Sequence, residues 1–188
     1  MDNRQKILEC ALALFAERGY DAIGVQEIVE NAGVTKPTLY HYFGSKRGLL
    51  EALLDRYYEE FDHLLVAAAS YRGDLPLTLR RIAEVYFRYA LDHPTYYRLQ
   101  LSLGFAPQQS EAFQVVSGKN ERQFSLVENV FAAAVRDHGN MRGRQRVYAM
   151  TFIGVLNACI VLAFNGYVHL DDRLLERVVH QFEHGIYS

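Results

Sequence analysis

The sequence predicts an all-α protein with a small N-terminal domain and a larger C-terminal domain. Apolar residues recur at helical spacing along most of the 188 residues, and no segment alternates apolar and polar residues for the length of a strand. Glycine, proline and capping residues interrupt this pattern at short intervals. Half of the residues are hydrophobic, which is enough for a sizeable core. We expect the N-terminal domain at residues 1–47 and the C-terminal domain at residues 48–188, joined through a shared helix.

Three short helices are predicted in the N-terminal domain. The first covers about residues 3–18, and the second covers residues 25–32. Gly33 allows a tight turn into the third helix, for which the Thr35 hydroxyl is a suitable N-cap. Pro37 is tolerated in the first turn, where backbone N–H groups have no helical acceptor. The second and third helices therefore form a helix-turn-helix.

The C-terminal domain is predicted to contain six helices, of which the one that starts at Pro94 is short. Ser45 caps the first of them, and Asp74 with Pro76 opens the next. One helix is expected to stop at Gly139-Asn140, with a possible interruption near Ser117-Gly118. The expected ranges are 46–69, 74–93, 94–103, 108–138, 144–165 and from Asp171 or Asp172 toward the C-terminus.

The region around the third helix is locally positive in a chain with a net charge of −2. From Asn31 to Leu50 there is no acidic residue, whereas three basic residues occur there. Leu39 and Phe43 stand four residues apart, so they share one helix face and can point inward. The pattern favours a helix that rests on phosphates and base edges of DNA, although an ordinary helical hairpin with a mixed face is the alternative. The outward positions are Lys36, Pro37, Thr38, Tyr40, His41 and Tyr42.

Residues from about Arg4 to Leu54 resemble the N-terminal DNA-binding domain of the TetR family of transcriptional regulators. Residues 7–20, 28–34 and 38–43, followed by Ser45 and Lys46, carry the resemblance in the order and spacing of the family. It implies a homodimer that binds a palindromic double-stranded DNA operator and releases it when a small-molecule effector binds. By position, it implies DNA contacts at Lys36, Pro37, Thr38, Tyr40, His41 and Tyr42 and a phosphate contact at Lys46; we add Thr35 to this set.

Two positions depart from the family pattern. Gly24 stands where the family often has Thr or Ser, so this chain has no hydroxyl there to bind a phosphate. Glu27 could reach back toward Gly24 as half of a capping box. Gln26 stands where Arg or Lys is common, and its amide can instead read adenine through two hydrogen bonds.

The C-terminal domain is rich in aromatic residues that either line an apolar effector pocket or only form the core. We expect a mostly apolar pocket of a few hundred Å³ that is bordered by the fifth to eighth helices, which favours a largely apolar effector. Asn157 is a polar amide inside an apolar run, and it could bond a neighbouring helix, a dimer partner or the effector. The predicted effector-binding residues are Tyr86, Tyr89, Tyr97, Phe105, Phe124, Phe152 and Asn157.

The last two predicted helices have the features of a dimer interface. The uncharged stretch 147–164 approaches the length of a membrane span, but we expect a helix buried on all sides and no membrane. Small residues permit close helix approach, and the apolar stripe of the last helix would be exposed on a monomer. Two such helices from each subunit would form a four-helix bundle. The predicted interface residues are Gly154, Ala158, Leu174, Leu175, Val178, Val179 and Phe182.

The sequence gives no positive support for a cofactor, a metal site or catalysis. His180 and His184 stand four residues apart but have no third ligand nearby in the sequence. Cys10 and Cys159 lie in apolar helical runs, where packing is the expected role. No nucleophile motif and no phosphate-binding glycine loop is present. We therefore expect a cytoplasmic, ligand-responsive repressor and not an enzyme; the alternative is a helical ligand- or partner-binding module without strong operator affinity.

Overall fold

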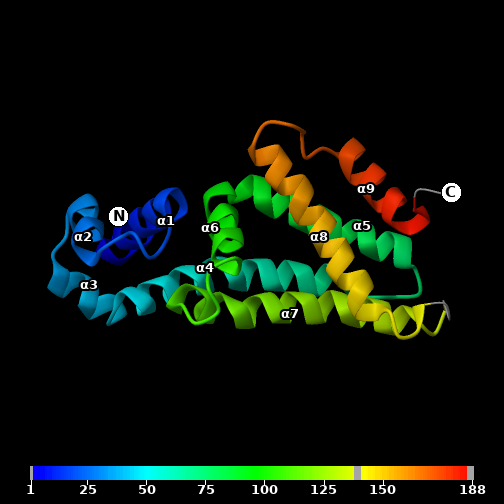
Figure 1. Cartoon of the computed structure of the whole chain (residues 1–188), viewed down its shortest axis with the longest axis horizontal. Coiled ribbons are helices and arrows are strands. Elements are labelled where there is room, and N and C mark those ends of the chain that lie inside the picture. Colours follow the sequence, from blue (N-terminus) through cyan, green and yellow to red (C-terminus); the bar gives the residue numbers. More distant parts are fainter. Residues whose placement is uncertain (1, 138–140, 186–188) are drawn as a thin grey trace. The chain divides into compact units, whose positions relative to one another are not determined.

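The computed structural model describes residues 2–137 and 141–185, and over these ranges the chain forms helices and no strand (Figure 1). The all-α prediction is confirmed. The helices are α1 (Asn3–Arg18), α2 (Val25–Ala32), α3 (Lys36–Phe43), α4 (Lys46–Ala68), α5 (Leu75–Asp92), α6 (Pro94–Gly104), α7 (Glu111–Ala134), α8 (Gln145–Phe164) and α9 (Asp172–His184).

Side-chain caps explain where several helices begin. A capping oxygen accepts a hydrogen bond from one of the first backbone N–H groups, which have no acceptor within the helix. Thr35 Oγ1 accepts from the Thr38 N–H at 3.4 Å, and Ser45 Oγ accepts from the Gly48 N–H at 2.9 Å. The same arrangement starts α5 and α9, where Asp74 accepts from Leu77 at 2.9 Å and Asp171 accepts from Leu174 at 2.8 Å.

The bounds of α7 differ from the prediction. The helix begins at Glu111 and continues without interruption through Ser117 and Gly118 to Ala134. Ser117 Oγ donates to the Gln114 carbonyl oxygen at 3.2 Å, so its hydroxyl is accommodated inside the helix. The stop expected at Gly139-Asn140 lies outside the described residues.

The predicted half capping box at the start of α2 is not formed. The Glu27 carboxylate pairs with the Arg18 guanidinium at the end of α1, instead of reaching back to Gly24. A charged partner competes successfully with the single backbone N–H that the box would have satisfied. The pair joins α1 to α2.

The chain divides into two compact units. The first runs to Glu60 and includes Thr95–Asn120, whereas the second comprises Phe61–Pro94 and the residues from Glu121 onward. By sequence, α4 and α7 each contribute to both units. The predicted domain boundary between residues 47 and 48 divides the chain by the function of its parts, and it stays a prediction.

The first unit is built on the packing of α1, α2 and α3 against one another. Its core includes fully buried Ile7, Phe15, Ile28 and Leu39. Gly48 permits the close succession of α3 and α4, because a Cβ at this position would lie 2.1 Å from the Phe43 carbonyl oxygen.

In the second unit, α5 packs against both α8 and α9, and α8 also contacts α9 (Figure 1). The expectation that α8 is buried on all sides is wrong for the single chain. Only 28% of the most apolar 18-residue stretch of α8 is buried. Val147 and Met150 are each 57% exposed. Packing against α5 and α9 covers part of the helix, so an apolar face stays open. By length and composition α8 could also cross a membrane.

Candidate functional site

The α3 helix presents the predicted DNA-contacting residues on the surface. Leu39 is fully buried among α1, α2 and α3, which fixes the inward face of the helix. Thr38 is half-buried, and its hydroxyl lies 2.9 Å from that of Thr35. The structure therefore brings a cation, hydroxyls and rings together on one short helix. The exposed residues are Thr35, Lys36, Pro37, Tyr40, His41 and Tyr42.

The turn before α3 sets the direction of this helix relative to α2. Gly33 closes α2 in the left-handed conformation with φ 64°, which favours glycine. Its N–H donates to the Glu30 carbonyl, and the Val34 N–H donates to the Val29 carbonyl. These bonds satisfy the end of α2 while the chain reverses into α3.

Gln26 is exposed on α2, where its amide donates to the Glu30 carboxylate. This placement is compatible with the predicted base contact, but the side chain must exchange Glu30 for a base. A carboxylate beside a base-reading amide also disfavours nearby phosphate, so Gln26 stays the least supported member of the predicted set.

Lys46 stands at the first position of α4 and is half-buried. Its Nζ lies 4.0 Å from the centre of the Tyr20 ring and 5.9 Å from that of Phe15. Burial lowers the pKa of this ammonium group, while the carboxylates of Asp21 and Glu111 oppose the shift. The predicted phosphate ligand is thus held against an aromatic surface.

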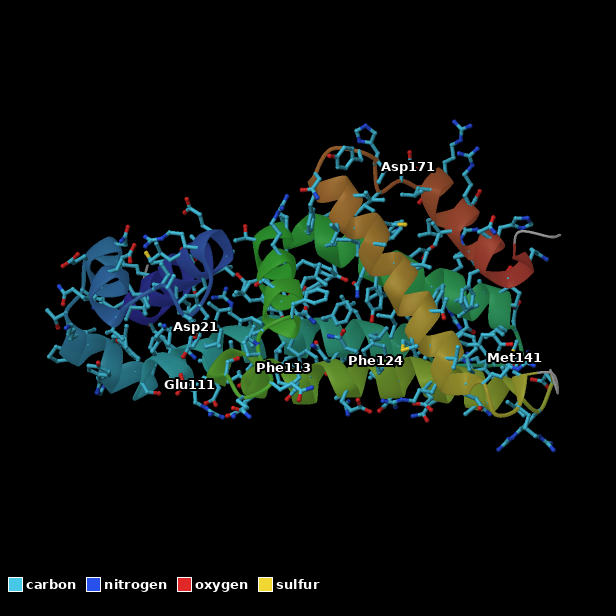
Figure 2. The ribbon with its side chains drawn as sticks, in the orientation of Figure 1. Asp21, Glu111, Phe113, Phe124, Met141 and Asp171 are labelled. Atoms are coloured by element: carbon cyan, nitrogen blue, oxygen red, sulfur yellow. The ribbon has the colours of Figure 1, made fainter. Side chains whose placement is uncertain are left out.

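The sequence interpretation missed two residues beside Lys46. The Tyr20 hydroxyl donates to Glu111 Oε2 at 2.8 Å, and burial together with this bond raises the pKa of Tyr20. Figure 2 labels Glu111 at the start of α7 and Asp21, which follows Tyr20 in sequence. The contact joins positions 91 residues apart, so no local pattern could have indicated it.

The seven predicted effector residues do not form one described pocket. Tyr97 and Phe105 belong to the first unit, whereas the other five belong to the second. Phe105 is 90% exposed, so the structure does not support it as the wall of an enclosed pocket. It follows the end of α6, where the chain leaves the helix before its ring can pack.

In the second unit, three of these residues belong to the aromatic core. Tyr86, Tyr89 and Phe152 are buried. The Phe61 ring lies 5.1 Å from that of Tyr86 and 4.9 Å from that of Tyr89. Phe124 and Asn157 are half-buried. These contacts favour the core alternative for the tyrosines and Phe152.

Gln123 is a buried polar residue that the sequence interpretation did not single out. Its side chain on α7 is 7% exposed, and its Nε2 donates to no acceptor in the described part of the chain. A buried amide without a partner is costly, so such a group is a candidate donor to a bound molecule. Its helical spacing from Val127 and Val130 gave it the pattern of one more core position.

Hollows in the second unit lie around α9, and two of them have mainly apolar linings. A groove of about 730 Å³ runs between α8 and α9, with Val147, Thr151, Val155 and Val178 among its lining residues. A cavity of about 300 Å³ is lined by residues that include Leu79, Phe131, Met141, Tyr148 and Phe182. Neither is lined by the seven predicted effector residues, which places the available volume nearer α9 than we expected.

The predicted interface residues differ in how much surface they offer to a partner chain. Gly154 and Ala158 are exposed on α8, and Leu174, Val178 and Phe182 are half-buried. Leu175 and Val179 are buried within their own chain, where α9 packs on α5, so they have almost no surface to offer a partner. Exposed apolar residues that the prediction omitted extend the α8 face, namely Val147, Met150, Val161 and Leu162.

The histidines, the cysteines and the acidic side chains are the candidate metal ligands. Among the described residues, no group of three or more His, Cys, Asp and Glu side chains could hold an ion. The rings of His180 and His184 lie 4.4 Å apart on α9. Cys10 and Cys159 are half-buried, and burial raises the pKa of both thiols, which disfavours the reactive thiolate form.

The sequence matches two family models that together cover most of the chain. Residues 7–53 match the model of bacterial regulatory proteins of the tetR family. Residues 79–182 match the tetracyclin repressor-like C-terminal domain. The first match covers most of α1, all of α2 and α3 and the start of α4, and the second covers most of the C-terminal helices.

Individual relatives extend this comparison. The HTH-type transcriptional regulator YuxN of Bacillus subtilis is 36% identical over 129 residues, which span 67% of this chain and 43% of YuxN. The chain thus spans less than half the length of that relative. The HTH-type transcriptional activator FasR of Mycolicibacterium smegmatis is 29% identical over 154 residues, or 82% of this chain and 68% of FasR. FadR of Bacillus subtilis, solved with stearoyl-CoA, has a TM-score of 0.80 at 18% identity and covers 97% of this chain and 99% of its own.

Proposed function

Because the chain belongs to the TetR family of bacterial transcriptional regulators, we propose that it is a cytoplasmic repressor that a small, largely apolar effector releases from a palindromic operator. The exposed, acid-free face of α3 is the observation that carries this proposal. Lys36, Thr38 and Gln26 read bases, Lys46 and the tyrosine hydroxyls bind phosphates, and Pro37 touches a thymine methyl group. Each subunit of a homodimer places one α3 in the major groove of a half-site.

The open face of α8 supports the homodimer. Gly154 and Ala158 let a partner helix approach closely. The exposed apolar residues around them on α8 include no charged residue. A second copy that contributes its own α8 and α9 would cover this face and much of the 730 Å³ groove. Dimerisation also supplies the two reading helices that a palindrome requires.

The effector site is proposed in the second unit, with Gln123 as a hydrogen-bond donor. The buried Nε2 of Gln123 suits a carbonyl or carboxyl oxygen, and the surrounding helices are rich in apolar side chains. Fatty acyl compounds combine these two features. The fold neighbour FadR carries stearoyl-CoA, which makes fatty acyl compounds the first class to test.

Selection of bound genomic fragments, followed by footprinting, tests the DNA-binding part of the proposal. We expect a palindromic protected site, and we expect a reporter driven by the linked promoter to rise when the regulator is deleted. A reporter that falls on deletion would identify an activator, as FasR is described. Equal affinity for selected and random fragments would favour the alternative, a ligand- or partner-binding module without strong operator affinity.

Thermal shift and operator release test the effector part. We expect fatty acyl compounds to raise the melting temperature and lower operator affinity together, because both follow from preferential binding to one state. Gln123→Leu should remove the shift while leaving operator binding in place, and the exposed Gln108→Ala serves as the matched control. A screen that gives neither effect would reject this effector class.

A further inference from the structure

Within the first unit, the start of α7 is hydrogen-bonded to the turn that follows α1. The Tyr20 hydroxyl donates to Glu111 Oε2 at 2.8 Å, and the Tyr20 ring meets the Phe15 ring edge-on with centres 5.2 Å apart. Tyr20 is only 4% exposed. Its ring is therefore fixed by packing on one side and by a charged acceptor at the hydroxyl end.

Lys46 lies on this fixed ring. Its ammonium group, 4.0 Å from the ring centre, is within the range of a cation–π interaction. The hydrogen bond to the Glu111 carboxylate places electron density on the phenol, which strengthens the attraction for a cation. The carboxylates of Asp21 and Glu111 also favour the charged form of Lys46. The ring contact restrains the ammonium end of a side chain that would otherwise rotate freely.

A second contact ties the next cation to the same region of α7. Arg47 Nη1 donates to Gln114 Oε1 at 3.1 Å, and its Nε bonds Glu51 on α4 at 2.9 Å. Glu111 and Gln114 lie three residues apart, so the first turn of α7 reaches two consecutive basic residues. The position of this turn is thereby linked to the cations at the start of α4.

We propose that Glu111 and Tyr20 are positioning residues for Lys46, which fix its ammonium group before DNA binds. The inference rests on the proposed function, because it takes Lys46 as a phosphate ligand. A pre-positioned ammonium loses less conformational freedom when it meets a phosphate, so operator affinity rises. Because Glu111 belongs to α7, a movement of that helix changes the placement of Lys46. This links the first turn of α7 to a phosphate contact through Tyr20.

Operator binding by the full-length protein, measured by fluorescence anisotropy, tests the inference through a double-mutant cycle. Glu111→Ala and Tyr20→Phe should each weaken binding on the order of 3–10-fold, whereas in a Lys46→Ala background they should add almost nothing. Glu111→Gln keeps an acceptor for the Tyr20 hydroxyl and should retain most of the affinity. Both Tyr20→Phe and the exposed Glu111 changes leave the apolar core in place, and Gln108→Ala is the neutral control.

The outcomes separate the inference from the proposed function. If Lys46→Ala binds the operator as the wild type does, the phosphate role of Lys46 and the inference fall together. If Lys46→Ala weakens binding but Glu111→Ala and Tyr20→Phe do not, only the inference is overturned. Losses that add fully to that of Lys46→Ala would show that Tyr20 and Glu111 act elsewhere, and a Glu111→Gln variant as weak as Glu111→Ala would reject the hydrogen bond as the positioning element.

Discussion

The α3 surface (Thr35, Lys36, Pro37, Tyr40, His41 and Tyr42) and the α8 face (Val147, Met150, Gly154, Ala158, Val161 and Leu162) are both exposed in the single chain, but their chemistry is opposite. The α3 surface combines a cation with hydroxyl, imidazole and phenol groups that water solvates well. The α8 face has no charge, and its exposure to water is unfavourable. The first surface needs an anionic, hydrogen-bonding partner, whereas the second needs an apolar one.

Exposed residues therefore indicate two different kinds of partner in this molecule. The length and apolar composition of α8 alone would allow it to span a membrane. Its small residues and its packing on α5 and α9 instead favour a second helix pair of the same kind. If this account is right, a charge should be tolerated poorly on the α8 face, and loss of a charge should be tolerated poorly on the α3 surface.

Ala158→Glu should have the largest effect. Its side chain is exposed in the single chain, so each subunit should still fold, but the dimer would have to bury an uncompensated carboxylate on the α8 face. We expect the mass from light scattering to fall from dimer to monomer at micromolar concentration, and operator binding to be lost with it. Val178→Glu, in the groove between α8 and α9, should act in the same direction.

Leu64→Glu is the matched control for these changes, because Leu64 is an exposed leucine on α4. It should leave the mass unchanged. A soluble, intact dimer of Ala158→Glu would show that α8 is not the interface.

Lys36→Ala should change specificity more than general affinity for DNA. Removing a base contact costs about 1–3 kcal/mol at one position per half-site, while contacts to the phosphates persist. Selection with randomised operators would show relaxed preference at one symmetric pair of positions. An unchanged preference would remove Lys36 from the base-reading set.

Lys46→Ala should instead weaken binding to every sequence by a similar factor. Each neutralised phosphate contributes roughly 0.9 to the slope of log affinity against log salt, so the slope should become flatter by that amount for each phosphate that Lys46 no longer neutralises. Anisotropy titrations from low to moderate salt measure it. A parallel shift without a change of slope would mean that Lys46 touches no phosphate.

The smallest effects should come from removal of the helix caps. One cap belongs to α3 and the other to α9, so the two variants test the DNA-binding and the dimer surface separately. Thr35→Ala removes the cap of α3, and Asp171→Ala removes that of α9. Each should lower the free energy of unfolding by about 1 kcal/mol. The first should reduce operator affinity with little change in dimer mass, and the second should favour dissociation. If the two variants changed operator affinity and dimer mass to the same extent, the proposed distinction between the two surfaces would be wrong.

Local signals in the sequence predicted the helices and much of the α3 surface. Capping residues such as Thr35, Asp74 and Asp171 act within one helical turn, so spacing alone located the starts of α3, α5 and α9. The alternation of buried Leu39 with exposed neighbours on α3 likewise depends on residues close in sequence. These features required no knowledge of distant contacts.

Features that depend on distant segments could not be predicted in this way. Glu111 approaches Tyr20 across 91 positions, which no rule of local spacing indicates. The surroundings of Phe105 and Gln123 could not be predicted for the same reason, because helical spacing does not say whether a ring finds a neighbour or whether an amide finds an acceptor. The open face of α8 shows that an apolar helix can be incompletely covered by its own chain.

The affinity of the purified protein for its selected operator and for a scrambled duplex of equal length, at one physiological salt concentration, tests the central claim most directly. We predict that the operator binds at least about 10³-fold more tightly, with two symmetric half-sites roughly one helical turn apart. Equal affinities for the two duplexes would contradict the account, because the α3 surface would then attract phosphates without reading a sequence.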